Sequence, residues 1–203
     1  MVKAKRDLPV IAFKSQQAWD AWLASQPPRS KGLWLKLAKK SSGIASVSKQ
    51  EAVDAALCHG WIDGQLDSFD DRYWLIRFTP RQPTSKWSEK NRARALQLVE
   101  LKRMRAAGLS EIERAKKDGR WNAAYAPQST AQMPDDLCAA LAKNKEAKSF
   151  FETLDSTNRY AILYRIHDAK KPETRMARIE KYVTMLTEGQ TIRPQKAKPS
   201  KKA

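Results

Sequence analysis

Four side chains with catalytic potential stand close together in the chain: Cys58 and His59, followed by Asp63 and Asp67. Cysteine, histidine and aspartate are the components of nucleophilic sites in which a base activates a thiol. Two carboxylates near one another are also the machinery of acid–base hydrolysis. The elements that carry these four side chains decide whether either arrangement can form.

A helix is predicted from the S-x-x-E capping box of Ser48 and Glu51 to Gly60, a glycine placed where helices typically end. Neighbouring side chains on a helix diverge by about 100°, so the Cys58 thiol and the His59 ring should not face each other. The negative end of the helix dipole also raises the pKa of a thiol. We therefore interpret Cys58 as structural and His59 as a residue that complements the last helical carbonyls.

Residues 61–69 and 72–80 are predicted to form two strands around a short turn, which favours an antiparallel pair. An unbroken strand would place Asp63 and Asp67 on one face about 13 Å apart, too far to act on one bond. The chain lacks a glycine-rich phosphate loop, an HExxH motif and a GxSxG motif. We predict no catalytic residues, and an enzyme that uses Cys58 with His59 or Asp63 is kept as an alternative.

The two cysteines, Cys58 and Cys138, and the two histidines, His59 and His167, lack the paired spacing of zinc sites. No metal and no cofactor is predicted. No apolar run is long enough to cross a bilayer, and the apolar stretch near the N-terminus is too short for a signal peptide. Free thiols in the cytoplasm are the expectation.

The net charge of +17 is the strongest signal in the composition. Residues 193–203 contribute five Lys and Arg with no acid and no apolar periodicity, so 191–203 is predicted to be a disordered basic tail. Such a charge attracts polyanions or anionic membrane surfaces without distinguishing them. A nonspecific nucleic-acid-binding protein is therefore a second alternative, although no zinc-finger, RNP or recognition-helix motif is present.

A basic segment, residues 77–120, holds thirteen Lys and Arg against five Asp and Glu. Its start interleaves cations with aromatic residues and leads into a predicted helix N-terminus, where backbone N–H groups and cations together favour an anion. The predicted ligands of a phosphate-like group are Arg81, Ser85, Lys86, Trp87, Ser88, Asn91 and Arg92. The competing interpretation is a strand-to-helix corner anchored by Trp87, with solvated cations. The helix is expected to run to about Arg105 and end at Gly108, which spreads its arginines over several sides.

Early strands and late helices predict an α+β fold. The expected parts are an antiparallel sheet with helices over residues 1–125, a helical module over 126–190, and the tail. An alternative is that the helical part packs on the sheet as one unit.

Four stretches resemble the YdeI/OmpD-associated (OmdA) family of bacterial proteins, also called bacteriocin-protection proteins. They are ALCHGWIDG (56–64), RFTPRQPTSKWSEKN (77–91), AKKDGRWNAAY (115–125) and AKKPETRMARI (169–179). The resemblance runs from about residue 10 to 190. It implies a YdhG-like N-terminal part, a helical OmdA-type module, and a role in tolerance of bacteriocins or cationic antimicrobial peptides with a suggested porin link. It implies no reaction and no cofactor.

Within these stretches the residue types suggest architecture. The expected structural residues are Cys58, Gly60, Trp61, Asp63, Gly64, Trp121, Tyr125, Arg175 and Arg178. The aromatic ones should anchor contacts between modules, and the two arginines, which share a helix face, should pair with acids of the N-terminal part. The leading hypothesis is a non-enzymatic cytoplasmic stress protein that binds a protein partner or an anionic ligand.

Overall fold

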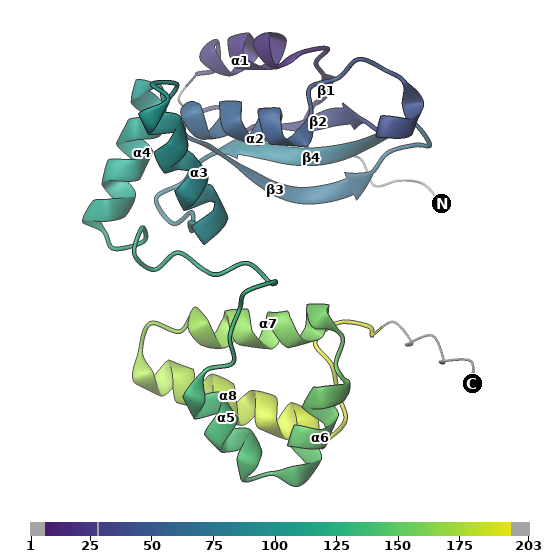
Figure 1. The fold of residues 1–203 in the computed structure, drawn as a ribbon, viewed down its shortest axis with the longest axis vertical. Coiled ribbons are helices and arrows are strands. Elements are labelled where there is room, and N and C mark those ends of the chain that lie inside the picture. Colours follow the sequence, from purple (N-terminus) through teal and green to yellow (C-terminus); the bar gives the residue numbers. More distant parts are fainter. Residues whose placement is uncertain (1–6, 28, 196–203) are drawn as a thin grey trace. The chain divides into compact units, whose positions relative to one another are not determined.

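The computed structural model describes residues 7–27 and 29–195, and the chain divides into two compact units, residues 1–124 and 125–203 (Figure 1). Each unit has its own hydrophobic core. The N-terminal unit combines a sheet with helices and the C-terminal unit is helical, so the predicted α+β class is confirmed.

The sheet has four strands in the order β1-β2-β4-β3. They are β1 (Val10–Ala12), β2 (Leu33–Ala38), β3 (Trp61–Ser68) and β4 (Tyr73–Pro80). The β3–β4 pair is antiparallel as predicted, and so is β2–β4. The expectation of a wholly antiparallel sheet is wrong, because β1 runs parallel to β2. A helix lies between these two strands in the chain and supplies the crossover that parallel neighbours need.

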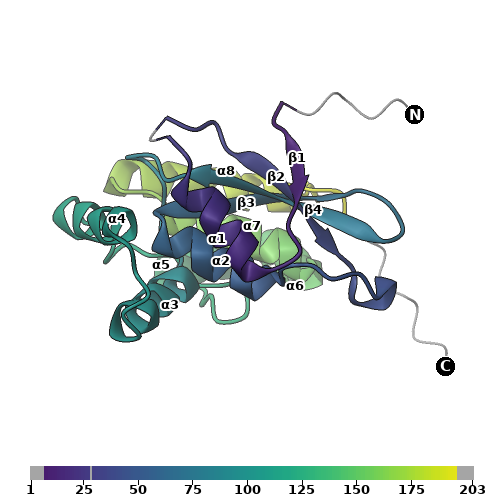
Figure 2. The same cartoon turned by 90° about the horizontal axis from the view of Figure 1, so that it is seen from above.

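Two helices cover one face of the sheet, α1 (Gln16–Ala24) and α2 (Lys49–Cys58) (Figure 2). Helix α2 begins as predicted, since the capping box of Ser48 and Glu51 is complete. Helix α1 begins after Ser15, whose hydroxyl accepts the Ala18 N–H. A short 3-10 helix, Lys40–Ser42, lies between β2 and α2. The buried residues between helices and sheet include Trp19, Leu23, Leu33, Leu35, Leu37, Ala52, Ala55, Ala56, Ile76 and Phe78.

Two further helices, α3 (Glu89–Glu100) and α4 (Ala106–Lys117), build a second core against the end of α2. Gly108 does not end a helix, contrary to expectation, but lies inside α4. A Cβ at this position would come within 2.7 and 2.5 Å of the carbonyl oxygens of Leu57 and Cys58. Glycine is therefore required for α4 to pack closely on α2.

The predicted helix from residue 88 to 105 is too long, since α3 ends at Glu100. Lys102 takes a positive φ of 54°, and its N–H donates to the Val99 carbonyl while the Arg103 N–H donates to that of Leu98. This is the Schellman termination that usually carries glycine. Because a lysine and not a glycine occupies this position, the sequence does not mark the end of the helix.

The C-terminal unit contains α5 (Asp135–Ala142), α6 (Lys145–Thr153), α7 (Ser156–His167) and α8 (Pro172–Thr187). Their apolar faces enclose one core, which includes Leu137, Leu141, Phe151, Leu154, Ile162, Ile166, Ile179 and Leu186. Disorder is the wrong prediction for residues 191–195, which bond to the start of α7 and the end of α6. The rest of the expected tail, residues 196–203, lies outside the described residues.

Candidate anion-binding pocket

Within the described residues, no hydrogen bond joins the Cys58 thiol to the His59 ring. Cys58 is buried, with 3% of its surface exposed. The ring of His59 points to a different partner, because its Nε2 lies 3.0 Å from Oδ1 of Asp20 on α1. Burial raises the pKa of the Cys58 thiol, which keeps it protonated and poorly nucleophilic. Gly60, at φ +75°, ends the helix as predicted, whereas the His59 ring does not complement the helical carbonyls.

The two carboxylates of β3 lie on opposite faces of the sheet, so their predicted shared face is wrong. Asp63 is opposite Phe78 in the β4 register, whereas Asp67 is opposite Leu75. The register shifts between residues 63 and 66, where Gly64 lies, and such a bulge reverses the alternation of side chains. The Asp63 carboxylate accepts a hydrogen bond from Asn91 Nδ2 at 3.3 Å, which gives it a structural contact with α3.

Within residues 7–27 and 29–195, no group of three or more His, Cys, Asp or Glu side chains is placed to hold a metal ion. Cys58 and His59 belong to the N-terminal unit, while Cys138 and His167 belong to the C-terminal one.

The predicted anion corner, residues 81–92, is built around a stacked arginine. The guanidinium carbon of Arg81 lies 3.6 Å from the centroid of the Trp87 ring, and its Nη1 donates to the Lys86 carbonyl at 3.2 Å. Arg81 is only 5% exposed, and Trp87 packs edge-on against Trp121. The arginine thus serves as part of the core, in a cation–π contact strengthened by desolvation.

The polar groups of the corner also bond to the protein. The Ser85 hydroxyl accepts the Gln82 N–H, and the Ser88 hydroxyl caps α3 by accepting the Asn91 N–H. Nη1 of Arg92 donates to the Trp121 carbonyl at 3.0 Å. These bonds are the local structure of a strand-to-helix corner. Anion binding by the corner stays a prediction.

A different set of cations converges on a pocket of about 400 Å³ in the N-terminal unit. The loop 101–105 between α3 and α4 contributes Lys102, Arg103 and Arg105, and the first turn of α1 contributes Gln16 and Gln17. The buried Cys58 forms part of the wall. Three cations and two amide side chains surround the hollow against one carboxylate, that of Asp20, and this excess of donors suits an anionic group that accepts several hydrogen bonds.

The charges around this pocket are incompletely neutralised. Lys102 and Arg103 make no side-chain hydrogen bond or ion pair with any residue that the structure describes. Arg105 lies 3.6 Å from Asp20 and is 63% exposed, so this contact is weak. The other oxygen of Asp20 already bonds to His59. We take the cluster of Lys102, Arg103 and Arg105, called the loop cations below, as the candidate site.

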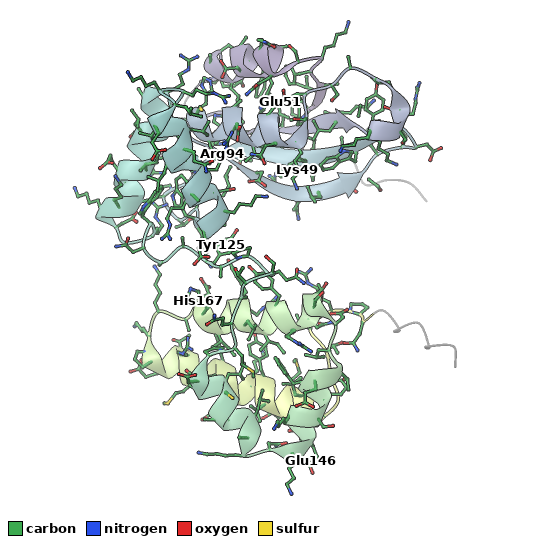
Figure 3. All side chains as sticks on the ribbon, viewed as in Figure 1. Lys49, Glu51, Arg94, Tyr125, Glu146 and His167 are labelled. Carbon is green, nitrogen blue, oxygen red and sulfur yellow. The ribbon has the colours of Figure 1, made fainter. Side chains whose placement is uncertain are left out.

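A buried ion pair links α3, the helix that precedes the loop cations, to α2. Arg94 on α3 is labelled in Figure 3. It bonds to Asp54 on α2, which is 4% exposed, through Nε at 2.7 Å and Nη2 at 2.5 Å. Gln50 Nε2 donates to the same carboxylate at 2.8 Å. Burial works to raise the pKa of Asp54, but the bonds from Arg94 and Gln50 outweigh it and leave the pKa below its usual value.

Sequence reasoning missed the loop cations because it extended α3 through them. On one continuous helix Arg103 and Arg105 would point to different sides. The reversal at Lys102 brings them to one pocket instead. The signal that was available is the run K-R-M-R, residues 102–105, which has three charged residues and only one apolar residue where the helix would need its buried stripe.

The structural residues of the family resemblance lie inside their own units. Trp61 packs against Trp22 in the sheet core, and Tyr125 packs edge-on against Tyr164 in the C-terminal unit. Arg175 and Arg178 do pair with acids, but the acids are Asp136 and Asp168 of the same unit. The expected pairing with the N-terminal part is therefore wrong, because Asp136 on α5 and Asp168 at the end of α7 are the acids that these arginines contact.

Comparison with known families assigns the C-terminal unit. Residues 130–189 match the OmdA family, described as "Bacteriocin-protection, YdeI or OmpD-Associated". This part of the chain, 60 of the 203 residues, is similar to the OmdA family. Residues 11–111 match a domain of unknown function (DUF8412). The predicted resemblance is thus confirmed for the OmdA domain, and the YdhG-like fold stays a prediction.

No curated protein and no solved structure matches the chain. In the described part of the chain, no helix is both long and apolar enough to span a membrane.

Proposed function

We propose that this protein is a non-enzymatic stress protein of the YdeI/OmdA type, which supports tolerance of bacteriocins or cationic antimicrobial peptides by binding an anionic partner. The OmdA domain supports the association with bacteriocin protection. The convergence of the loop cations on one pocket is the observation that carries the binding role. As part of this proposal the protein acts in the cytoplasm.

The charge distribution favours an anionic partner over direct capture of the cationic peptides. The N-terminal unit, residues 1–124, has 24 Lys and Arg against 13 Asp and Glu. A surface with this excess repels cationic peptides and attracts anions, and the effect weakens with salt. Tolerance would then come from a cellular anion that the protein binds, rather than from sequestering the peptide.

A binding role has more support than the alternative of an enzyme that uses Cys58. The thiol is buried and protonated, and the His59 ring is bonded to Asp20 instead. An enzyme of this kind would lose its function in Cys58→Ala. A binding protein should keep it, because the thiol contributes only a small part of the pocket wall.

The test is to delete the gene from its host and measure survival under polymyxin and bacteriocin challenge. We expect lower survival that the wild-type gene restores. A variant with Lys102→Gln, Arg103→Gln and Arg105→Gln should fail to restore it. The matched control carries Lys39→Gln, Lys40→Gln and Lys90→Gln, which remove the same charge from exposed positions outside the pocket. Unchanged survival on deletion, or equal rescue by both triple variants, would contradict the proposal.

A further inference from the structure

One face of α7 in the C-terminal unit forms the floor of a second pocket, with a volume of about 510 Å³. Five lining residues recur at helical spacing of three and four along α7: Thr157, Tyr160, Ala161, Tyr164 and Arg165. Residues that are near one another on a helix face in this way present a continuous surface. The opposite face of α7, with Ile162 and Ile166, lies in the core.

Three tyrosines make this pocket aromatic. Tyr125, labelled in Figure 3, precedes the segment that matches the OmdA family. Its ring meets that of Tyr164 edge to face, with centroids 5.1 Å apart at 87°. Tyr160 lies 6.0 Å from Tyr164 and donates its hydroxyl to the Ala126 carbonyl at 2.8 Å. Segment 125–126 is thereby tied to α7, and the rings are held in place before any ligand arrives.

The buried side-chain amide of Asn158 holds the backbone of Arg193 beside the pocket. Asn158, 1% exposed, accepts the Arg193 N–H at 2.9 Å and donates to the Arg193 carbonyl at 3.2 Å. Gln195 adds bonds to Asp155 and Thr153. The backbone of the segment after α8 is thus fixed on α7, and the side chain of Arg193 lines the pocket.

The pocket is basic in a unit that is otherwise almost neutral. Residues 125–192 contain ten Lys and Arg against nine Asp and Glu, yet the pocket is lined by Arg165 and Arg193 with no acidic residue. In the sequence Arg193 is followed by four lysines, at positions 196, 198, 201 and 202. Aromatic faces and cations are therefore combined in this pocket.

We propose that this pocket binds single-stranded nucleic acid, with one base against the tyrosines and the adjoining phosphates at Arg165 and Arg193. Stacking of a base on an aromatic side chain contributes about 1–3 kcal/mol and accepts any base, because every base has a π face. Arginine is suited to phosphate oxygens, because its planar fork of donors matches their geometry. Duplex bases are already stacked, so the tyrosines select an unpaired strand.

The experiment is fluorescence anisotropy with the full chain and a labelled oligothymidine of about 12 nucleotides, compared with a duplex of equal length. We expect the single strand to bind more tightly than the duplex. Tyr164→Leu, which keeps the bulk but removes the π face, should weaken binding about ten-fold at every salt concentration. Tyr160→Phe keeps its ring and loses only the hydroxyl bond to the Ala126 carbonyl, so it should weaken binding less than Tyr164→Leu does.

Arg193→Gln should weaken binding at low salt and reduce the slope of log Kd against log salt by about 0.7, the value for one phosphate contact on a single strand. Lys145→Gln removes one charge from an exposed site on α6 outside the pocket and is the matched control. Thermal unfolding of each variant checks that the helices remain folded, and Arg193→Gln keeps the proposal testable if Tyr164→Leu does not fold.

Several results would overturn the proposal. The first is equal affinity for duplex and single strand. The second is binding that neither Tyr164→Leu nor Arg193→Gln weakens but that is lost when residues 196–203 are removed. The third is thymidine monophosphate binding as tightly as the oligonucleotide. The proposal is independent of the proposed function, since the triple variant of the loop cations should bind the oligonucleotide like its charge-matched control. Loss of one activity therefore leaves the other intact.

Discussion

Two basic regions of the N-terminal unit differ in what their cations contact. In the corner, residues 81–92, Arg81 stacks on Trp87 and Arg92 donates to the Trp121 carbonyl. In the loop 101–105, Lys102 and Arg103 have no side-chain hydrogen bond within the described residues and line a pocket with Arg105. The corner looked like the binding site in the sequence because its cations alternate with aromatic residues. In the structure that same alternation builds a core contact.

The difference teaches that the partner of a cation, rather than the density of cations, separates structure from binding. A guanidinium that stacks on a buried ring or donates to a backbone carbonyl stabilises the fold, so its removal costs stability. An exposed cation on a pocket wall contributes little to stability but acts on an approaching anion. Substitutions in the two regions should therefore change different quantities.

The largest expected effect is at Arg94, which lies in α3 between the two regions. Arg94→Gln leaves the buried Asp54 carboxylate with a weaker partner and should cost about 3 kcal/mol at neutral pH. All seven tryptophans lie in residues 1–124, so urea unfolding followed by tryptophan fluorescence reports this unit alone. Lys116→Ala, which breaks an exposed pair with Glu113, is the control and should cost less than about 0.5 kcal/mol.

The same variant should change the pH dependence in a defined direction. In the wild type the pKa of Asp54 is lowered on folding, so its contribution to stability is present above the unfolded pKa and is lost as pH falls through the folded pKa. Without Arg94, burial is opposed less and the pKa rises, so protonation relieves the buried charge. The deficit of Arg94→Gln should therefore shrink between pH 7 and pH 4. A deficit that stays constant would contradict this account of the pair.

The next effect is at Arg81 in the corner. Arg81→Ala removes the cation–π contact and the bond to the Lys86 carbonyl from a site that is 5% exposed, and should cost about 2 kcal/mol. Arg103→Ala, at the exposed loop, should cost less than about 0.5 kcal/mol in the same unfolding assay. If the two costs were equal, the distinction between corner and loop would be lost.

The smallest effect is at Lys102. Its φ of 54° strains an L-residue, so Lys102→Gly should raise the free energy of unfolding by about 0.5–1 kcal/mol. Lys102→Ala keeps the strain and should give no gain. A gain in Lys102→Ala that matched Lys102→Gly would show that the lysine charge, rather than the backbone, is destabilising.

Local chemistry predicted much of the fold. The capping box of Ser48 and Glu51, the end of α2 at Gly60 and the β3–β4 pair are visible as residue types at fixed spacing, and they appear as expected. The failures are places where tertiary contacts overrode a local rule. The bulge beyond Asp63 and the parallel β1–β2 pair depend on neighbouring strands that the sequence does not display.

The candidate site was harder to predict than the fold because it depends on one backbone reversal. Lys102 adopts a conformation that glycine normally marks, so the sequence carried no sign of the turn. Gly108 appeared to mark the end of that helix, but its role is close packing of α4 on α2. A helix predicted to end five residues too late points the loop cations to different sides. The pocket therefore could not be predicted from the sequence.

The most direct test of the account is isothermal titration of pyrophosphate into the full chain at low ionic strength. The wild type and the Lys39→Gln, Lys40→Gln, Lys90→Gln control should bind with affinities within about two-fold of each other, because exposed charges outside the pocket act only through a screened field. The Lys102→Gln, Arg103→Gln, Arg105→Gln variant should bind at least ten-fold more weakly, which corresponds to about 1.4 kcal/mol. Equal weakening in both triple variants would show that net charge alone attracts the anion, and would contradict a pocket formed by the loop cations.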